Sequence, residues 1–257
     1  MRRLTTYELE DGVATIAMDD GKVNALSPAM LDELLGAFDR AAGDEAPVVL
    51  TGRMTTFSAG FDLCCEPERW PDMVAAGARL AERIMCFPQP VVAACNGNAI
   101  AMAAFMLLSA DHRIGTAGDY RIGLNEVAIG LTIPWFGVEI ARHRLSRPYF
   151  DRCTITGALL GPAEALDAGF LDRLVEPDQL EVSAHATARR LSALDRAAHA
   201  RVWGRTEQKL ALRIGIRQRG RSARSRPQPD SRSRRQPWWR RSRTSPTAAV
   251  SSAISAR

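Results

Sequence analysis

The chain has 257 residues, of which 46% are hydrophobic and 25% charged, and its net charge is +5. This length can bury a substantial core and hold one large domain with a smaller appendage. No stretch approaches the ~18 uninterrupted apolar residues of a membrane span, and the two arginines near the N-terminus are not followed by the apolar run of a secretory signal. We therefore expect a cytoplasmic protein without a membrane partner.

The charge is divided sharply along the chain. Residues 1–200 contain 18 Lys and Arg against 27 Asp and Glu, whereas residues 201–257 contain 16 against 2. The basic isoelectric point thus describes the end of the chain and not its larger part. From about Ile216 onward Arg, Ser, Pro and Gln dominate without any apolar period, and such a segment is predicted to be disordered.

The cysteines and histidines suggest no cross-link and no metal. The cysteines are odd in number and form no C-x-x-C pair: Cys64, Cys65, Cys86, Cys95 and Cys153. The four histidines show no ligand spacing. We therefore expect reduced cysteines and neither a disulfide framework nor a metal site.

The first half of the chain alternates between strand and helix patterns. A β-branched run predicts a strand over 13–18, and the buried runs 47–52 and 91–95 predict two more. Ser27 and Pro28 form an N-cap signal that opens an amphipathic helix, while residues 72–86 and 99–108 are predicted as further helices, the last apolar all round. This alternation predicts a mostly parallel sheet.

The second half continues the alternation with shorter elements. Strands are predicted over 111–115 and 170–175, and helices over 136–144, 147–155, a short stretch after Pro162, and 178–194. Repeated strand–turn–helix units can form either a doubly wound sheet or a spiral. Periodicity alone leaves both open.

Residues 122–136 place one carboxylate, Glu126, in an otherwise apolar stretch. Burial raises the pKa of a carboxyl group, so Glu126 is a candidate proton carrier near neutral pH. The alternative is a glutamate that complements a helix dipole or forms an ordinary ion pair.

Four motifs together resemble the crotonase superfamily, the enoyl-CoA hydratases and isomerases. They are Asn24-Ala25-Leu26, the run 57–63 (FSAGFDL), Asn96-Gly97, and the run 123–126 (GLNE) followed by Ile133-Pro134, in matching order over residues 5 to 200. The resemblance implies an α/β fold for residues 1–200, a spiral of ββα turns. It also implies an acyl-CoA thioester substrate, a homotrimer or hexamer, and no cofactor, because CoA is part of the substrate.

The resemblance implies an oxyanion hole made of two backbone N–H groups, those of Phe61 and Met102. Such donors stabilise an enolate oxygen by ~3 kcal/mol each in a dry site. The residues that fall where the family contacts CoA, mostly through backbone, are Val23, Ala25, Ala59, Gly60 and Asp62. Asp62 has an alternative interpretation as a cap for the turn that follows it.

One departure from the family concerns the catalytic pair of the hydratases. The first of their two glutamates falls on Phe105, whose ring can neither hold a water nor carry a proton. Glu126 matches the second, in a context closest to the Δ3,Δ2-enoyl-CoA isomerases. We therefore predict a fatty-acid enzyme in which Glu126 shifts the double bond and Phe105 helps to exclude water. The alternatives are a hydratase of low activity and a silent acyl-CoA-binding protein.

Two further departures concern the backbone and the tail. Ala101-Met102-Ala103-Ala104 stands where the family has two or three glycines. The family ends in helices, whereas residues 201–257 are expected to form a disrupted helical region and an Arg/Ser/Pro-rich tail, a change that a shifted reading frame between about His199 and Ile216 would explain. Nucleic-acid binding through arginines interleaved with Trp238 and Trp239 is the alternative, and we favour a tail without function.

Overall fold

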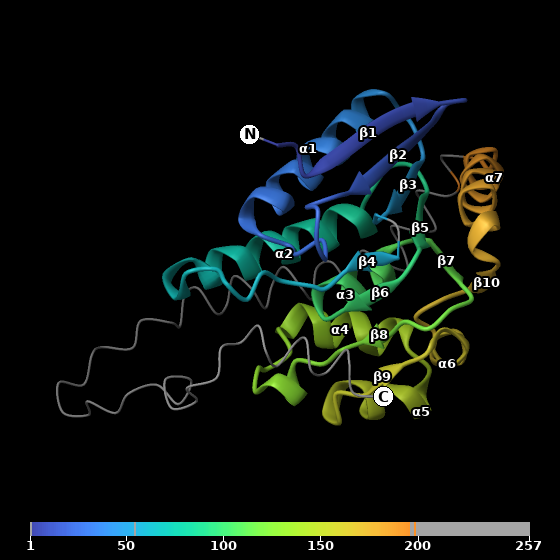
Figure 1. Ribbon diagram of the computed structural model, residues 1–257. Coiled ribbons are helices and arrows are strands. Elements are labelled where there is room, and N and C mark those ends of the chain that lie inside the picture. Colours follow the sequence, from blue (N-terminus) through green and yellow to red (C-terminus); the bar gives the residue numbers. More distant parts are fainter. Residues whose placement is uncertain (1, 54, 196–197, 199–257) are drawn as a thin grey trace, which may run out of the picture.

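The computed structural model describes residues 2–53, 55–195 and 198, and its elements are labelled in Figure 1. The predictions for the C-terminal helical region, the tail and the proposed frame shift lie outside these residues. The described part is built around two sheets of unequal size, with helices on both faces of the larger one (Figure 1).

The larger sheet has six strands in the order β1-β2-β3-β5-β7-β10. From β2 onward every neighbouring pair is parallel, while β1 joins β2 as an antiparallel hairpin. The prediction of a mostly parallel sheet is therefore confirmed. The strands are β1 (Thr5–Glu10), β2 (Val13–Met18), β3 (Val48–Thr51), β5 (Val91–Cys95), β7 (His112–Thr116) and β10 (Arg173–Val175).

The smaller sheet has four strands in the order β4-β6-β8-β9. Its first three strands run parallel to one another, and β9 pairs with β8 in the antiparallel sense. The strands are β4 (Thr56–Ser58), β6 (Asn98–Ile100), β8 (Ile122–Gly123) and β9 (Leu159–Leu160).

The chain passes repeatedly through both sheets and a helix. β3, β4 and α2 (Trp70–Met85) form one turn, and β5, β6 and α3 (Met102–Ser109) form the next, before β7, β8 and α4 (Trp135–Arg144). This order is a spiral of ββα turns, as the resemblance implied. The other helices are α1 (Pro28–Gly43), α5 (Arg147–Ile155), α6 (Pro162–Ala168) and α7 (Leu180–Ser192), with short 3-10 turns η1 (Pro67–Arg69), η2 (Val127–Ile129) and η3 (Pro177–Gln179).

Helices pack on the two faces of the larger sheet and bury alternate residues of its strands. In β3, Val48 and Leu50 face the main core beside α1 and α2, whereas Val49 faces α7 together with Ala184. α3 is buried over all eight of its residues, as its uniformly apolar sequence predicts. The parallel strands are hydrophobic on both sides because helices cover both sides.

The N-cap predicted at Ser27 is present. Its side-chain oxygen accepts a hydrogen bond from the Met30 N–H at 3.2 Å, and Pro28 is the first residue of α1. Proline fits there because the first N–H groups of a helix have no intrahelical acceptor.

The prediction of one helix over 99–108 was wrong at its start, where residues 98–100 form β6. Sequence patterns also missed β1, β4, β8 and β9. Three of these four strands have only two or three residues, too few for a period to be recognised. Their strand conformation depends on pairing with residues distant in the sequence.

A partly buried ion pair links β7 to the residue just before β10. Arg113 of β7 donates from Nε to the Asp172 carboxylate at 2.8 Å, and its side chain is 8% exposed. Burial would raise the pKa of Asp172, but the hydrogen bonds and charge of Arg113 outweigh it and hold this pKa below its usual value. The pair fixes the turn that leads into β10.

Over the residues that the structure describes, no helix is long and apolar enough to cross a membrane. The same residues contain no group of three or more His, Cys, Asp or Glu side chains able to hold a metal ion.

Candidate active site

Three loops converge where the parallel strands of the smaller sheet end. β4 pairs with β6 and β6 with β8, so the residues that follow these strands emerge at the same edge. They are residues 59–61, 101–102 and 124–126, which contain the sequence-predicted Phe61, Met102 and Glu126. The carboxyl ends of parallel strands are where α/β sheets place ligand sites.

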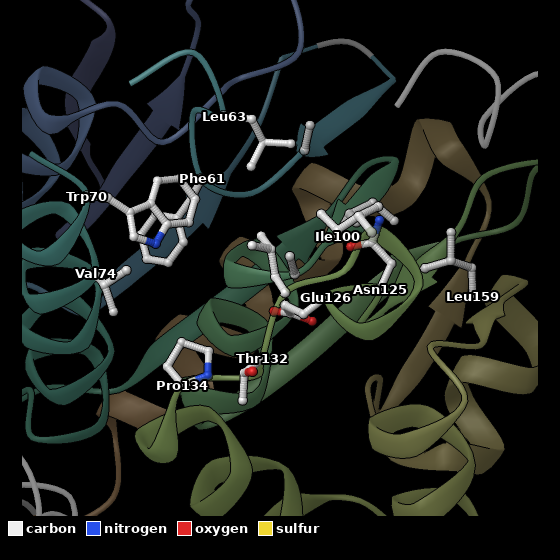
Figure 2. A pocket seen from close by; sticks show the side chains of 14 residues that line it. Phe61, Leu63, Trp70, Val74, Ile100, Asn125, Glu126, Thr132, Pro134 and Leu159 are labelled. Atoms are coloured by element: carbon white, nitrogen blue, oxygen red, sulfur yellow. The ribbon is translucent and has the colours of Figure 1, made fainter. Parts of the chain in front are cut away.

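These loops enclose a cavity of about 180 Å³. Figure 2 shows its lining, with Glu126 among side chains that are mostly apolar. The lining residues come from the three loops and the residues next to them, the segment 129–134, α2 and β9: Ala59, Phe61, Leu63, Trp70, Val74, Ile100, Ala101, Asn125, Glu126, Ile129, Leu131, Thr132, Pro134 and Leu159.

Glu126 is the single carboxylate among these lining residues, and it is 6% exposed. Burial raises its pKa to about 7, with its own backbone N–H acting in the opposite direction. Its Oε2 atom is buried without a hydrogen-bond partner. The predicted desolvation and raised pKa are confirmed, and no ion pair to Glu126 is formed by the part of the chain that the structure describes.

The loop after β4 lies against the start of α3. A β-carbon added at Gly60 would lie 2.6 Å from the Ile100 carbonyl oxygen and 3.4 Å from the Met102 nitrogen. Met102 is the first residue of α3, and the first N–H groups of a helix lack intrahelical acceptors. The Gly60–Phe61 peptide and the Met102 N–H are therefore neighbours beside the cavity.

Ala101 holds the turn between β6 and α3 in a strained conformation. Its φ of 54° and ψ of −118° are unusual for any residue other than glycine, and its N–H donates to the Gly123 carbonyl at 2.9 Å. Ala101, which belongs to the run expected to replace family glycines, thus has a glycine-like backbone. The cost of such a conformation is about 1–3 kcal/mol.

We expect Ala101→Gly to raise the free energy of unfolding by about 1 kcal/mol. Relief of the strain stabilises the folded state by more than the added conformational entropy of glycine stabilises the unfolded chain. Thermal unfolding checks this through a Tm increase of about 2–4 °C. Ala103→Gly, the same change inside α3, serves as the control and should lower the Tm. A lower Tm for Ala101→Gly would contradict the strain.

The predicted CoA-contacting residues lie on two segments, residues 23–26 and 59–62, that run side by side. The Ala59 N–H donates to the Val23 carbonyl at 2.9 Å, and the Leu26 N–H donates to the Gly60 carbonyl at 2.8 Å. Asn24 reinforces the contact, because its side-chain amide donates to the Phe57 carbonyl at 3.1 Å. The structure thus brings Val23 and Ala25 next to Ala59 and Gly60, although only Ala59 of these four lines the cavity.

Two sequence interpretations are refined by the side-chain contacts. The Asp62 carboxylate accepts a hydrogen bond from the Cys64 N–H at 2.9 Å, so it does cap the turn that follows. Phe105 is 1% exposed and does not line the cavity. Its ring packs edge-on against Phe136, with centroids 5.8 Å apart, and fills the space left by Gly137. The expected apolar wall is therefore made by other residues, among them Ile100 and Leu159.

The sequence predicted a helix over 72–86, and Val74 of this helix, α2, lines the cavity. Sequence analysis missed Trp70, whose ring packs edge-on against Phe61 with centroids 6.0 Å apart. It also missed Asn125 and Leu159. The run 123–126 contains Asn125, but nothing in the sequence distinguishes a cavity-facing asparagine from a surface one.

Residues 8–236 match the family model described as enoyl-CoA hydratase/isomerase. The chain belongs to this family. Its fold agrees as well: a Mycobacterium tuberculosis structure described as an enoyl-CoA isomerase covers 86% of the chain with a TM-score of 0.82 and 40% identity, over 98% of its own length. A second structure from this organism, described as a probable enoyl-CoA hydratase, matches with the same TM-score and identity over 96% of its length.

Relatives of both kinds occur in the enoyl-CoA hydratase/isomerase family. The mitochondrial enoyl-CoA delta isomerase 1 of Rattus norvegicus is 30% identical over 200 residues, covering 75% of this chain and 68% of the relative. A putative enoyl-CoA hydratase of Thermus thermophilus is 34% identical over 193 residues, covering 70% and 75%. The family is thus established, while these names do not separate isomerase from hydratase.

Proposed function

We propose that this protein is an enoyl-CoA isomerase that moves a double bond from position 3 to position 2 of an acyl-CoA thioester. The observation that carries the proposal is one buried carboxylate with a pKa of about 7 in an otherwise largely apolar cavity. Such a group can both accept and return a proton at neutral pH. The similarity to the human mitochondrial Δ3,Δ2-enoyl-CoA isomerase, which is 27% identical with a TM-score of 0.81, supports an isomerase activity.

The reaction needs no co-reactant. The Glu126 carboxylate removes a proton from C2 of the 3-enoyl thioester. The electrons of that C–H bond form a double bond between C1 and C2, the π electrons of the carbonyl group move onto the thioester oxygen, and the resulting dienolate keeps its C3–C4 double bond. When the carbonyl group re-forms, the C1–C2 electron pair becomes the C2–C3 double bond, and the C3–C4 electron pair takes the proton from the Glu126 carboxylic acid at C4. The thioester bond stays intact, and the carboxylate is regenerated.

We propose that the backbone N–H groups of Phe61 and Met102 donate hydrogen bonds to the negatively charged oxygen of the dienolate. The close approach of Gly60 to the start of α3 supports this pairing, because a β-carbon added at Gly60 would lie 3.4 Å from the Met102 nitrogen. The dipole of α3 adds a favourable potential at its N-terminus. Each donor aimed at the developing charge lowers the barrier by ~3 kcal/mol.

The cavity also supports isomerisation over hydration. The two-glutamate route to hydration requires a second carboxylate beside the substrate, and Phe105, at the aligned position, is turned toward α4. Glu126 is the one acid or base among the lining residues. Hydration at low rate is the second candidate, favoured by the kinship with proteins named hydratases.

A comparison of the two reactions tests the proposal. A 3-enoyl-CoA should be converted to the 2-enoyl isomer much faster than a 2-enoyl-CoA is hydrated. Because Glu126 must be ionised to remove the C2 proton, kcat/KM should rise with pH up to about 7 and level off above it. Faster hydration, or a profile that levels off near pH 4.5, would contradict the single-carboxylate mechanism.

A further inference from the structure

The cavity contains a second unsatisfied acceptor beside Glu126. The Oδ1 atom of Asn125 and the Oε2 atom of Glu126 are both buried, and neither has a hydrogen-bond partner. Both residues line the same cavity (Figure 2). Buried polar atoms in native proteins nearly always have a partner. Two such atoms on neighbouring residues therefore point to groups that a ligand brings.

The two acceptors differ in how they can be satisfied. The Glu126 carboxyl group carries its own proton below a pKa of about 7, whereas an amide oxygen can only accept. The backbone around Asn125 is fixed, because its carbonyl accepts the Ile129 N–H at 3.3 Å as η2 begins. Asn125 thus offers a positioned acceptor to whatever occupies the cavity.

We propose that Asn125 is a specificity-determining residue that accepts a hydrogen bond from an N–H or O–H group of the bound thioester. The inference rests on the proposed function and adds a requirement to it. The hydrocarbon part of an enoyl chain has only C–H bonds, so the donor is either a hydroxyl on the acyl chain or an N–H or O–H group of the CoA part, of which the amide nearest the sulfur lies closest to the thioester. A site built for such a donor discriminates against ligands that lack it.

Binding measurements with three probes separate the two donors. Isothermal titration of the full-length protein is made with butyryl-CoA, 3-hydroxybutyryl-CoA and the butyryl thioester of N-acetylcysteamine, which keeps one amide. If the donor is the hydroxyl, Asn125→Leu should lower the affinity for 3-hydroxybutyryl-CoA by about tenfold or more and leave the affinity for butyryl-CoA unchanged. If the donor is the amide nearest the sulfur, the affinities for all three probes should fall by a similar factor.

Matched variants test the acceptor role itself. Asn125→Asp keeps an acceptor oxygen and should retain the hydrogen bond that Asn125→Leu loses. Gln179→Leu, which removes an exposed side-chain amide outside the cavity lining, should leave all three affinities unchanged. Circular dichroism and Tm measurements confirm that each variant is folded.

Three results would overturn the inference. The first is unchanged affinities in Asn125→Leu. The second is equal losses in Asn125→Leu and Asn125→Asp, which would indicate that the amide nitrogen donates. The third is losses in Gln179→Leu as large as those in Asn125→Leu. Binding of none of the thioesters by the wild type would instead refute the proposed function.

Discussion

Glu126→Gln is expected to reduce kcat for double-bond isomerisation by a factor of about 10²–10⁴, the usual contribution of a positioned general acid–base. The amide has nearly the same shape as the carboxyl group but cannot take the C2 proton. Because the cavity lining stays otherwise intact, the affinity for a saturated acyl-CoA should change little. Steady-state kinetics with a 3-enoyl-CoA and titration with butyryl-CoA measure the two quantities.

A matched control is available in Glu139, a second buried glutamate, 7% exposed on α4 and outside the cavity lining. Glu139→Gln is the same exchange of a buried carboxyl group for an amide, yet it should retain turnover. Equal losses in both variants would show that the effect of Glu126→Gln is structural. Full turnover in Glu126→Gln would refute the proton-transfer role.

The same substitution should change the pH dependence of stability. The folded-state pKa of Glu126 is about 7 against an ordinary value of 4.5, so the folded protein binds an extra proton between these values. The free energy of unfolding of the wild type should therefore fall, relative to Glu126→Gln, as the pH rises from about 4.5 to about 7. At about 1.4 kcal/mol per pKa unit the difference amounts to about 3 kcal/mol. Urea unfolding at pH 5 and pH 8 measures it.

Gly60→Ala is expected to lower kcat/KM by about 10²-fold and to destabilise the fold by more than 1 kcal/mol. The added β-carbon would lie 2.6 Å from the Ile100 carbonyl oxygen, and the φ of +87° is itself unfavourable for alanine. The backbone must shift, and it carries the Phe61 N–H with it. A misplacement of about 1 Å at a reacting centre costs this much activity.

Gly12→Ala is the matched control for this change. Gly12 lies in the turn between β1 and β2 with a φ of +73°, but nothing lies within 4 Å of an added β-carbon. It should therefore lose a similar amount of stability from φ alone and keep full kcat/KM. If Gly60→Ala kept full activity, the loop after β4 would not position a catalytic donor.

Sequence patterns predicted the longer elements because these satisfy a local rule. α1 begins at the predicted Ser27–Pro28 cap, and β2, β5 and α5 have the predicted bounds. The apolar stretch around Glu126 likewise predicted a buried carboxylate, which the 6% exposure confirms. The roles of Phe61 and Met102 rest on resemblance and remain predictions that the proposed experiments test.

The orientation of side chains could not be predicted in the same way. Phe105 was expected at the substrate, yet its ring packs on Phe136 and Gly137 of α4. The sequence identified Asn125 only as part of a motif, and that its side-chain oxygen is buried without a partner follows from the structure alone. These features depend on which helix covers a residue, and a linear sequence does not specify that.

The sequence by itself determined the alternation of strands and helices, the family, and the presence of one carboxylate in apolar surroundings, because each of these is written in local residue order. Tertiary structure alone decided that β4, β6 and β8 pair in parallel, so that loops about 40 and 25 residues apart open onto one cavity. It also decided that Ala101 takes a glycine-like conformation there. Strand pairing and strain arise from contacts between distant residues, and only the folded chain brings them together.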